Sequence, residues 1–154
     1  MTDTLHCLPG FMGQGADFTP LRQSLGLAPE RSPWQWPDAQ GCADIASYAE
    51  RCWPLFQAQI TAPFYCYAYS MGGRIALHWL NKAEFSEQCL GIFFAGAHTG
   101  LTSEQARLDR QQHDQRWAQA FCDQPITDTL IQWYQQPVFA NLTENQKSAL
   151  IAEK

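Results

Sequence analysis

The 154-residue sequence has little charge, and basic charge is the scarcer kind. Charged residues make up 16% of it, and 10 Lys and Arg stand against 15 Asp and Glu. Because the basic residues are scattered, they form no electrostatic footprint for a phosphate backbone. We therefore do not expect the protein to bind nucleic acid.

Long apolar runs and closely paired cysteines are also missing. No apolar segment reaches the roughly 18 residues of a membrane span, and the first residues do not resemble a signal peptide. The six cysteines include no CxxC pair and lie mostly in apolar stretches, which argues against a zinc site or a disulfide framework. These absences predict a cytoplasmic, unexported protein with buried thiols, no membrane association and no metal.

The sequence is instead rich in apolar and aromatic residues. Hydrophobic residues make up 45% of it and aromatic residues 13%, including six Trp. A chain of this length forms one ordinary domain and is too short for two independent cores. The surplus of aromatic side chains indicates either a pocket for an organic ligand or a surface that is covered by another element.

Segments of strand length alternate with segments of helical period. Residues 64–68 and 89–95 are continuous apolar runs, typical of parallel strands that are covered on both faces. Residues 4–8 and 34–36 each end at a proline-containing turn and are predicted as two further strands. Helices are predicted between the strands at 19–26, 43–60 and 72–82. This alternation predicts a mostly parallel, doubly wound α/β sheet.

After Gly96 the predicted elements are helices, and the first of them is rich in Gln, Arg and Asp. Three helical segments are predicted there: 102–122, 126–135 and 143–153. The last begins with Thr143 followed by Gln146, the spacing of a capping box. Because no strand pattern returns, we divide the chain into a partial core, residues 1–97, and a C-terminal helical cap, residues 98–154.

One serine lies between an apolar strand and an apolar helix. Its surroundings read Ala68-Tyr69-Ser70-Met71-Gly72. A nucleophile elbow places its serine on such a tight strand-to-helix turn, and the neighbouring residues are small because the two arms nearly touch. The context predicts that Ser70 is the catalytic nucleophile. The alternative is a capped turn with no chemical role.

Two backbone N–H groups are candidates for an oxyanion hole. Met71 begins the helix after Ser70, so its N–H and the helix dipole face charge that develops beside the serine. The turn at residues 9–13, Pro-Gly-Phe-Met-Gly, follows an earlier strand, where α/β-hydrolases place the second donor. The N–H of Phe11 is the candidate there. The alternative is a plain glycine turn.

An acid and a histidine to complete a catalytic triad are not evident after Ser70. The later histidines are His78, His98 and His113. His78 lies inside the predicted helix after the serine, and His113 lies in a polar helix. His98 follows the last predicted strand, but no acidic partner precedes it. The sequence therefore predicts no base for Ser70.

Residues 69–74, 96–101, 107–117 and 133–140 resemble one enzyme family, the last segment reading Trp-Tyr-Gln-Gln-Pro-Val-Phe-Ala. They are similar to the 2-succinyl-6-hydroxy-2,4-cyclohexadiene-1-carboxylate synthase (MenH) family of the α/β-hydrolase superfamily. The resemblance extends over essentially the whole chain from Leu5. The last octet is its most specific part, because the Ser-x-Gly-Gly turn occurs across all α/β-hydrolases.

The resemblance implies an α/β-hydrolase-like fold, incomplete here, and a lyase of menaquinone biosynthesis. Such a lyase eliminates pyruvate from an enolpyruvyl succinyl-cyclohexene carboxylate, a small molecule rich in carboxylates, and no cofactor is expected. The residues implied for substrate binding are Tyr69, Arg74, Arg110 and Trp133. Arginine offers carboxylates a planar, charged fork. The alternatives are a solvated helix position for Arg110 and ordinary packing for Trp133.

The sequence departs from the family pattern in three ways. Pro9 stands where the first turn usually has His, and residues 36–41 replace a Leu-Pro-Gly-His-Gly turn. The leading strands and the C-terminal part with the triad Asp and His are not found, so we expect a truncated chain. Besides the lyase, a serine ester or thioester hydrolase and a catalytically silent remnant that acts by binding stay open. The arginines favour the lyase, and oligomeric state is left open.

Overall fold

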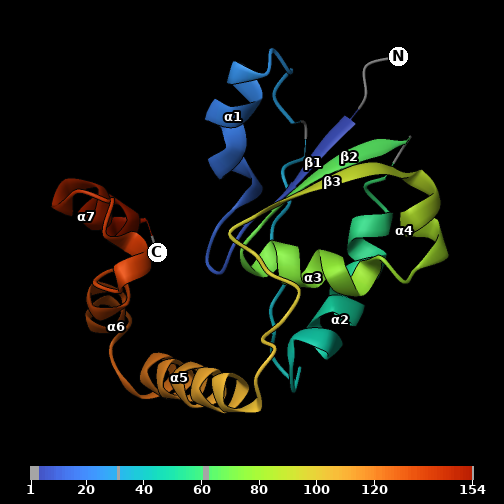
Figure 1. Ribbon diagram of the computed structural model, residues 1–154. Coiled ribbons are helices and arrows are strands. Elements are labelled where there is room, and N and C mark those ends of the chain that lie inside the picture. Colours follow the sequence, from blue (N-terminus) through green and yellow to red (C-terminus); the bar gives the residue numbers. More distant parts are fainter. Residues whose placement is uncertain (1–3, 31, 61–62, 154) are drawn as a thin grey trace. The chain divides into compact units, whose positions relative to one another are not determined.

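The computed structural model describes residues 4–30, 32–60 and 63–153 (Figure 1). The chain divides into two compact units, Met1–Gly100 and Leu101–Lys154. Among the described residues, all strands lie in the first unit. No helix in these ranges is both long enough and apolar enough to cross a bilayer.

The first unit is built on a three-stranded parallel sheet. The strands, in spatial order, are β1 (Thr4–Leu8), β2 (Phe64–Tyr69) and β3 (Cys89–Ala95). Both strand pairs are parallel, with one register irregularity between Phe64 and Tyr65 in the pairing with β3. The predicted strands at 4–8, 64–68 and 89–95 are confirmed.

Helices lie on both faces of this sheet (Figure 1). They are η1 (Gly15–Phe18), α1 (Thr19–Ser24), α2 (Ile45–Gln57), α3 (Met71–Trp79) and α4 (Ala83–Gln88). Phe56 of α2 contacts Phe64 on one face, with ring centroids 5.9 Å apart. On the other face Phe18 of η1 contacts Tyr67 at 5.4 Å. Parallel strands flanked by helices on both faces confirm the predicted α/β class.

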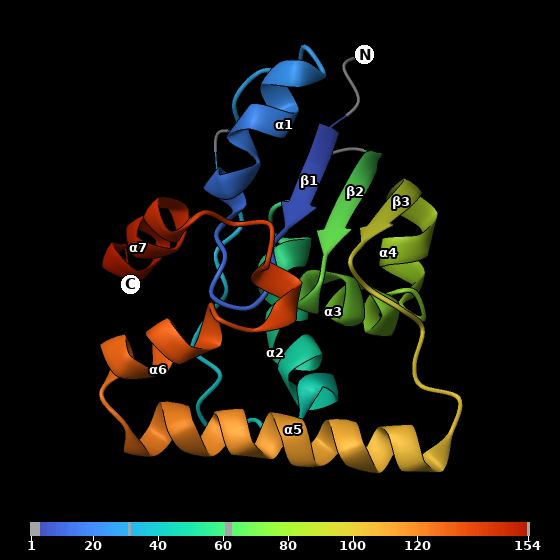
Figure 2. The same cartoon turned by 60° about the vertical axis from the view of Figure 1, so that its left-hand side comes forward.

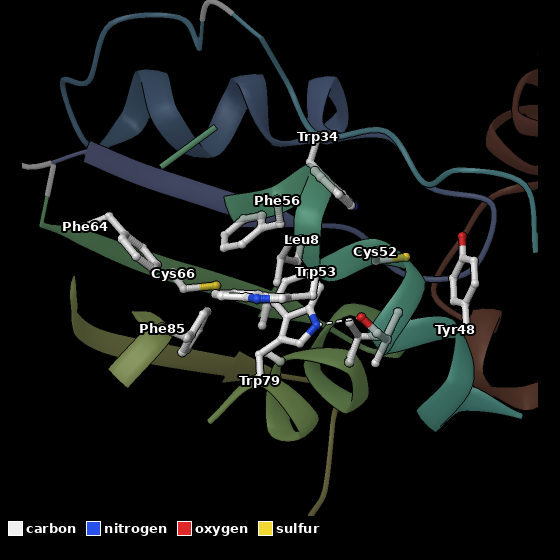
Figure 3. Packing of buried hydrophobic residues seen from close by; sticks show 14 residues of the cluster. Leu8, Trp34, Tyr48, Cys52, Trp53, Phe56, Phe64, Cys66, Trp79 and Phe85 are labelled. Carbon is white, nitrogen blue, oxygen red and sulfur yellow. Dashed lines mark hydrogen bonds between the residues drawn. The ribbon is translucent and has the colours of Figure 1, made fainter. Parts of the chain in front are cut away.

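An aromatic cluster fills the space between the sheet and its covering helices (Figure 3). Trp79 stacks on Phe56 with ring centroids 4.7 Å apart. The indole Nε1 of Trp79 donates a hydrogen bond of 2.9 Å to the carbonyl oxygen of Ala49, which joins α3 to α2. Trp34 and Phe85 are buried in the same cluster. Such large side chains dominate the apolar stabilisation, because each buries about 150–250 Å².

The predicted strand at residues 34–36 is wrong. Among the described residues this segment has no strand partner, and its polar groups bond to the loop after β1. The carbonyl of Trp34 accepts from the N–H of Gly15 at 2.7 Å, and Nε1 of Trp36 donates to the carbonyl of Pro9 at 3.1 Å. The alternation of tryptophans resembles a strand, although it places the Trp34 ring in the aromatic core and the Trp36 indole against the loop after β1.

β3 is less covered than its continuous apolar sequence predicts. Leu90 and Phe93 are 52% and 64% exposed. In the part of the chain that the structure describes, β3 is an edge strand whose sole partner is β2. The prediction that both faces of this strand are covered is therefore wrong for these residues.

The six cysteines are free thiols, and their burial differs. Cys7, Cys52 and Cys66 are buried, whereas Cys122 in the second unit is exposed. Burial raises the pKa of Cys7 and that of Cys52 to about 11 each. The expectation of buried thiols is wrong for Cys122, which lies on a helix with no buried residue.

The second unit is helical (Figure 2). Its helices are α5 (Glu104–Asp123), α6 (Ile126–Trp133), η2 (Pro137–Phe139) and α7 (Glu144–Ala152). The hydroxyl of Thr129 donates to the carbonyl of Ala120 at 3.2 Å, which ties α6 to α5. Thr143 accepts from the N–H of Gln146, and the side chain of Gln146 accepts from the N–H of Thr143. The predicted capping box is confirmed.

Candidate active site

Ser70 joins β2 to α3 with a backbone conformation that is rare outside glycine. Its φ is 51° and its ψ is −114°, and such a conformation in a residue with a side chain is strained. Its N–H donates to the carbonyl of Ala95 at 2.8 Å, and its carbonyl accepts from the N–H of Arg74 at 3.2 Å. The turn is therefore held by β3 and by the first turn of α3.

Glycines let α3 approach the ends of the strands. A β-carbon on Gly72 would lie 2.4 Å from the carbonyl oxygen of Leu8. A β-carbon on Gly73 would lie 2.5 Å from the β-carbon of Ala97. Because real β-carbons do not come this close, both positions need glycine. The local sequence after Ser70 thus meets the steric demand of a tight strand-to-helix turn.

The turn at residues 9–13 lies directly against Ser70. A β-carbon on Gly10 would be 3.3 Å from the β-carbon of Ser70. The turn is closed by a 3.1 Å hydrogen bond from the N–H of Gly13 to the carbonyl of Gly10. Met12 in this turn has a φ of 60°, so strained residues lie on both sides of the contact. Strain of this kind concentrates at functional sites.

A hollow of about 550 Å³ adjoins this turn within the first unit. Its wall includes Phe11, Gln14, Trp36, Asp44, Tyr48 and Met71. The hydroxyl of Tyr48 donates to the carbonyl of Pro37 at 2.6 Å, and burial raises the pKa of this phenol above its usual value. Hydrogen bonds from Ser47 hold the pKa of the exposed Asp44 carboxyl below its usual value. The wall of the hollow thus combines apolar and polar side chains and includes one carboxylate.

Two predicted substrate residues lie at the same end of the sheet as Ser70. Tyr69 precedes it and is 43% exposed, with its ring against Gly10 and Gly96. Arg74 is exposed in the first turn of α3. Among the described residues, the guanidinium group of Arg74 forms no hydrogen bond or ion pair. Such an exposed guanidinium can form a two-pronged contact with a carboxylate.

The other two predicted substrate residues lie in the second unit, where Arg110 contacts its own helix α5 and Trp133 of α6 packs against α5. Nε of Arg110 donates to the carboxylate of Asp114 at 2.8 Å, with the Arg110 side chain 51% exposed. Trp133 packs against Trp117 and Phe121, with ring centroids 4.9 Å and 5.5 Å away. The contacts of Arg110 are those expected of a solvated helix position. The contacts of Trp133 are those expected of ordinary packing.

Among the described residues, no histidine side chain forms a hydrogen bond with the Ser70 hydroxyl that could make it a base. His78 lies within α3. The Nδ1 atom of His98 accepts from the N–H of Gly100 at 3.1 Å. The His113 ring lies 6.4 Å from that of Trp117 within α5. Nor do the described residues contain a group of three acidic, histidine or cysteine side chains that could hold a metal ion.

Comparisons with known proteins find similar synthases in three bacteria. A 2-succinyl-6-hydroxy-2,4-cyclohexadiene-1-carboxylate synthase from Pectobacterium atrosepticum is 32% identical over 97% of this chain and 60% of its own length. The chain is similar to a synthase of this name over almost its whole length. The synthases of that name from Escherichia coli strain SE11 and Salmonella paratyphi B are 39% and 43% identical, each over 58% of this chain and 34% of its own length. No family model matches.

The chain spans about 60% of the length of the Pectobacterium member of the MenH family. Within this span the structure brings together Ser70, the N-terminus of α3 at Met71 and the turn that carries Phe11. Tyr69 and Arg74 lie beside them. Their roles stay predictions for this chain, as do those of Arg110 and Trp133.

Proposed function

We propose that the protein is a lyase of menaquinone biosynthesis that eliminates pyruvate from an enolpyruvyl succinyl-cyclohexene carboxylate. The match to a synthase over 97% of the chain carries this proposal. The strained turn at Ser70, with a second turn packed against it, supports it independently. We assign residues 1–97 to a partial α/β-hydrolase core and residues 98–154 to a cap.

The reaction moves electrons without adding water. A ring proton is removed, a new ring double bond forms, and the bond between the ring carbon and the enolpyruvyl oxygen breaks. Pyruvate departs as its enol form and regains a proton on carbon. Negative charge passes through the substrate during this step, and the N–H groups of Phe11 and Met71 are the donors that we assign to it.

Ser70 is the residue that we assign to proton removal. A serine can accept a proton only when its own hydroxyl proton has an acceptor. The described residues place no hydrogen-bonded acceptor on the Ser70 hydroxyl. The activity of the 154-residue chain by itself is therefore the first quantity to measure.

The arginines separate the lyase from a general hydrolase. Guanidinium groups bind carboxylates through two parallel hydrogen bonds, and we assign Arg74 and Arg110 to binding the carboxylates of the substrate. A neutral ester has no carboxylate, so neither arginine would strengthen its binding. Because Ser70 and the adjacent turn would serve a serine ester or thioester hydrolase equally well, they do not distinguish the two activities.

The test follows pyruvate release from the enolpyruvyl substrate by the purified chain, with Ser70→Ala as the matched variant. The lyase predicts release that depends on Ser70. Hydrolysis of a neutral ester without pyruvate release would favour the hydrolase. Saturable binding of the succinyl-cyclohexadiene product with neither activity would favour the silent remnant that acts by binding.

A further inference from the structure

Two tryptophans bond to the two ends of the turn that carries Phe11. Before it, Nε1 of Trp36 donates to the carbonyl of Pro9 at 3.1 Å. After it, the carbonyl of Trp34 accepts from the N–H of Gly15 at 2.7 Å. The turn is thus fixed on both sides of Phe11 by one short segment of chain.

That segment is itself supported by α2. The hydroxyl of Tyr48 donates to the carbonyl of Pro37 at 2.6 Å. Nη1 of Arg51 donates to the carbonyls of Asp38 and Gln40 at 2.9 Å and 2.6 Å. Because α2 packs into the aromatic core, these bonds give the segment a rigid foundation.

The peptide group that Trp36 holds also lies against α3, the helix that follows Ser70. The Pro9 carbonyl oxygen that accepts from Trp36 also faces α3, since a β-carbon on Gly72 would lie 2.7 Å from it. Pro9 itself is fully buried. The peptide group just before the turn is therefore enclosed between the indole of Trp36 and the N-terminal turn of α3.

We propose that Trp36 is a positioning residue, whose indole N–H fixes the Pro9 peptide and thereby aims the N–H of Phe11 at charge that develops beside Ser70. This inference rests on the proposed function, in which Phe11 is an oxyanion donor. Trp36 acts through the Pro9 carbonyl and needs no contact with the reacting atoms. Trp36→Phe keeps an aromatic ring and removes the N–H.

Trp34 provides a matched control two positions away. Its side chain is 2% exposed, and among the described residues its Nε1 has no hydrogen-bond partner. Its ring packs against Phe56 at 5.6 Å in the core (Figure 3). Trp34→Phe therefore affects core packing, while the main-chain bond from Gly15 stays in place.

Amide hydrogen exchange of the purified chain tests this directly, resolved to residues 10–13. In Trp36→Phe we expect these amides to exchange about five- to tenfold faster, the effect of one lost hydrogen bond, with the amides of β2 unchanged. In Trp34→Phe we expect a lower Tm and unchanged exchange in the turn. Equal exchange of residues 10–13 in the wild type and in Trp36→Phe would overturn the proposal.

A kinetic comparison tests the consequence for chemistry. In Trp36→Phe we expect kcat for pyruvate release to fall about tenfold or more with little change in KM, because a donor is misplaced and binding groups are intact. A rise in KM with kcat unchanged would contradict positioning. If the wild-type chain releases no pyruvate, the proposed function fails, and hydrogen exchange alone decides the inference about Trp36.

Discussion

At the scale of single residues, the backbone of Ser70 carries a cost that only a glycine would avoid. Its φ of 51° and ψ of −114° lie in a region that glycine enters freely. We predict that Ser70→Gly is more stable than Ser70→Ala by about 1 kcal/mol, since both remove the hydroxyl and only glycine relieves the strain. Urea unfolding of the two variants measures this difference. Equal midpoints would show that the turn is unstrained.

Single arginine residues should also determine whether the protein prefers a charged substrate to a neutral one. Arg74→Ala or Arg110→Ala should reduce turnover of the carboxylate substrate about ten- to hundredfold, the worth of one charge-assisted contact, and leave hydrolysis of a neutral ester nearly unchanged. Steady-state rates on both substrates give the comparison. Equal losses on both would favour a general hydrolase. Asp114→Asn is a control, because it removes the partner of Arg110 and keeps the guanidinium group.

Burial also determines how readily each cysteine thiol reacts. Burial raises the pKa of the Cys7 and Cys52 thiols from 9.0 to about 11, so the thiolate is disfavoured in the folded protein. At pH 8 we expect iodoacetamide to modify the exposed Cys122 first and these two only after unfolding. The raised values stabilise the fold fully below pH 9, and this contribution is lost as pH rises toward 11. Mass spectrometry of the alkylated peptides would contradict this if Cys7 reacted as fast as Cys122.

At the scale of elements, close approach between α3 and β1 explains why the turn needs glycine. Gly72→Ala would place a β-carbon 2.4 Å from the Leu8 carbonyl, and we expect it to destabilise the fold by about 1–3 kcal/mol. Gly91→Ala is the control, because its nearest neighbour would be the Tyr65 ring at 3.5 Å, an ordinary contact. Thermal unfolding of both variants is the measurement. Equal Tm values would contradict the close approach.

The elements that could be predicted from sequence are those whose signal is local. The apolar runs of β2 and β3, the period of α2 and the Thr143 capping box each depend on neighbours in the chain. The segment at 34–36 was wrongly predicted as a strand, because its hydrogen bonds go to residues about 20 positions or more away in the sequence. α4 was not predicted, since six residues show too little periodicity.

The site could be predicted from sequence only in part. The Ser70 turn follows from small residues between a strand and a helix, a pattern visible in one stretch of chain. Trp36 had no such signal, because its partner Pro9 is brought to it by the fold. Asp114 did have a local signal, because it follows Arg110 by four residues, the spacing at which side chains meet on a helix.

At the scale of the whole molecule, a net charge of −5 repels a substrate that carries several carboxylates. Local cations are then needed to bind such a substrate, and the family resemblance implies this role for Arg74 and Arg110.

Simultaneous measurement of pyruvate and conjugated diene tests the central claim most directly. Elimination forms one ring double bond for each pyruvate released, so the purified chain should produce the two in equal amounts, and Ser70→Ala should produce neither. Hydrolysis of the enol ether would release pyruvate and leave a ring hydroxyl with no new diene. Pyruvate without diene, or equal release by the wild type and Ser70→Ala, would contradict the account.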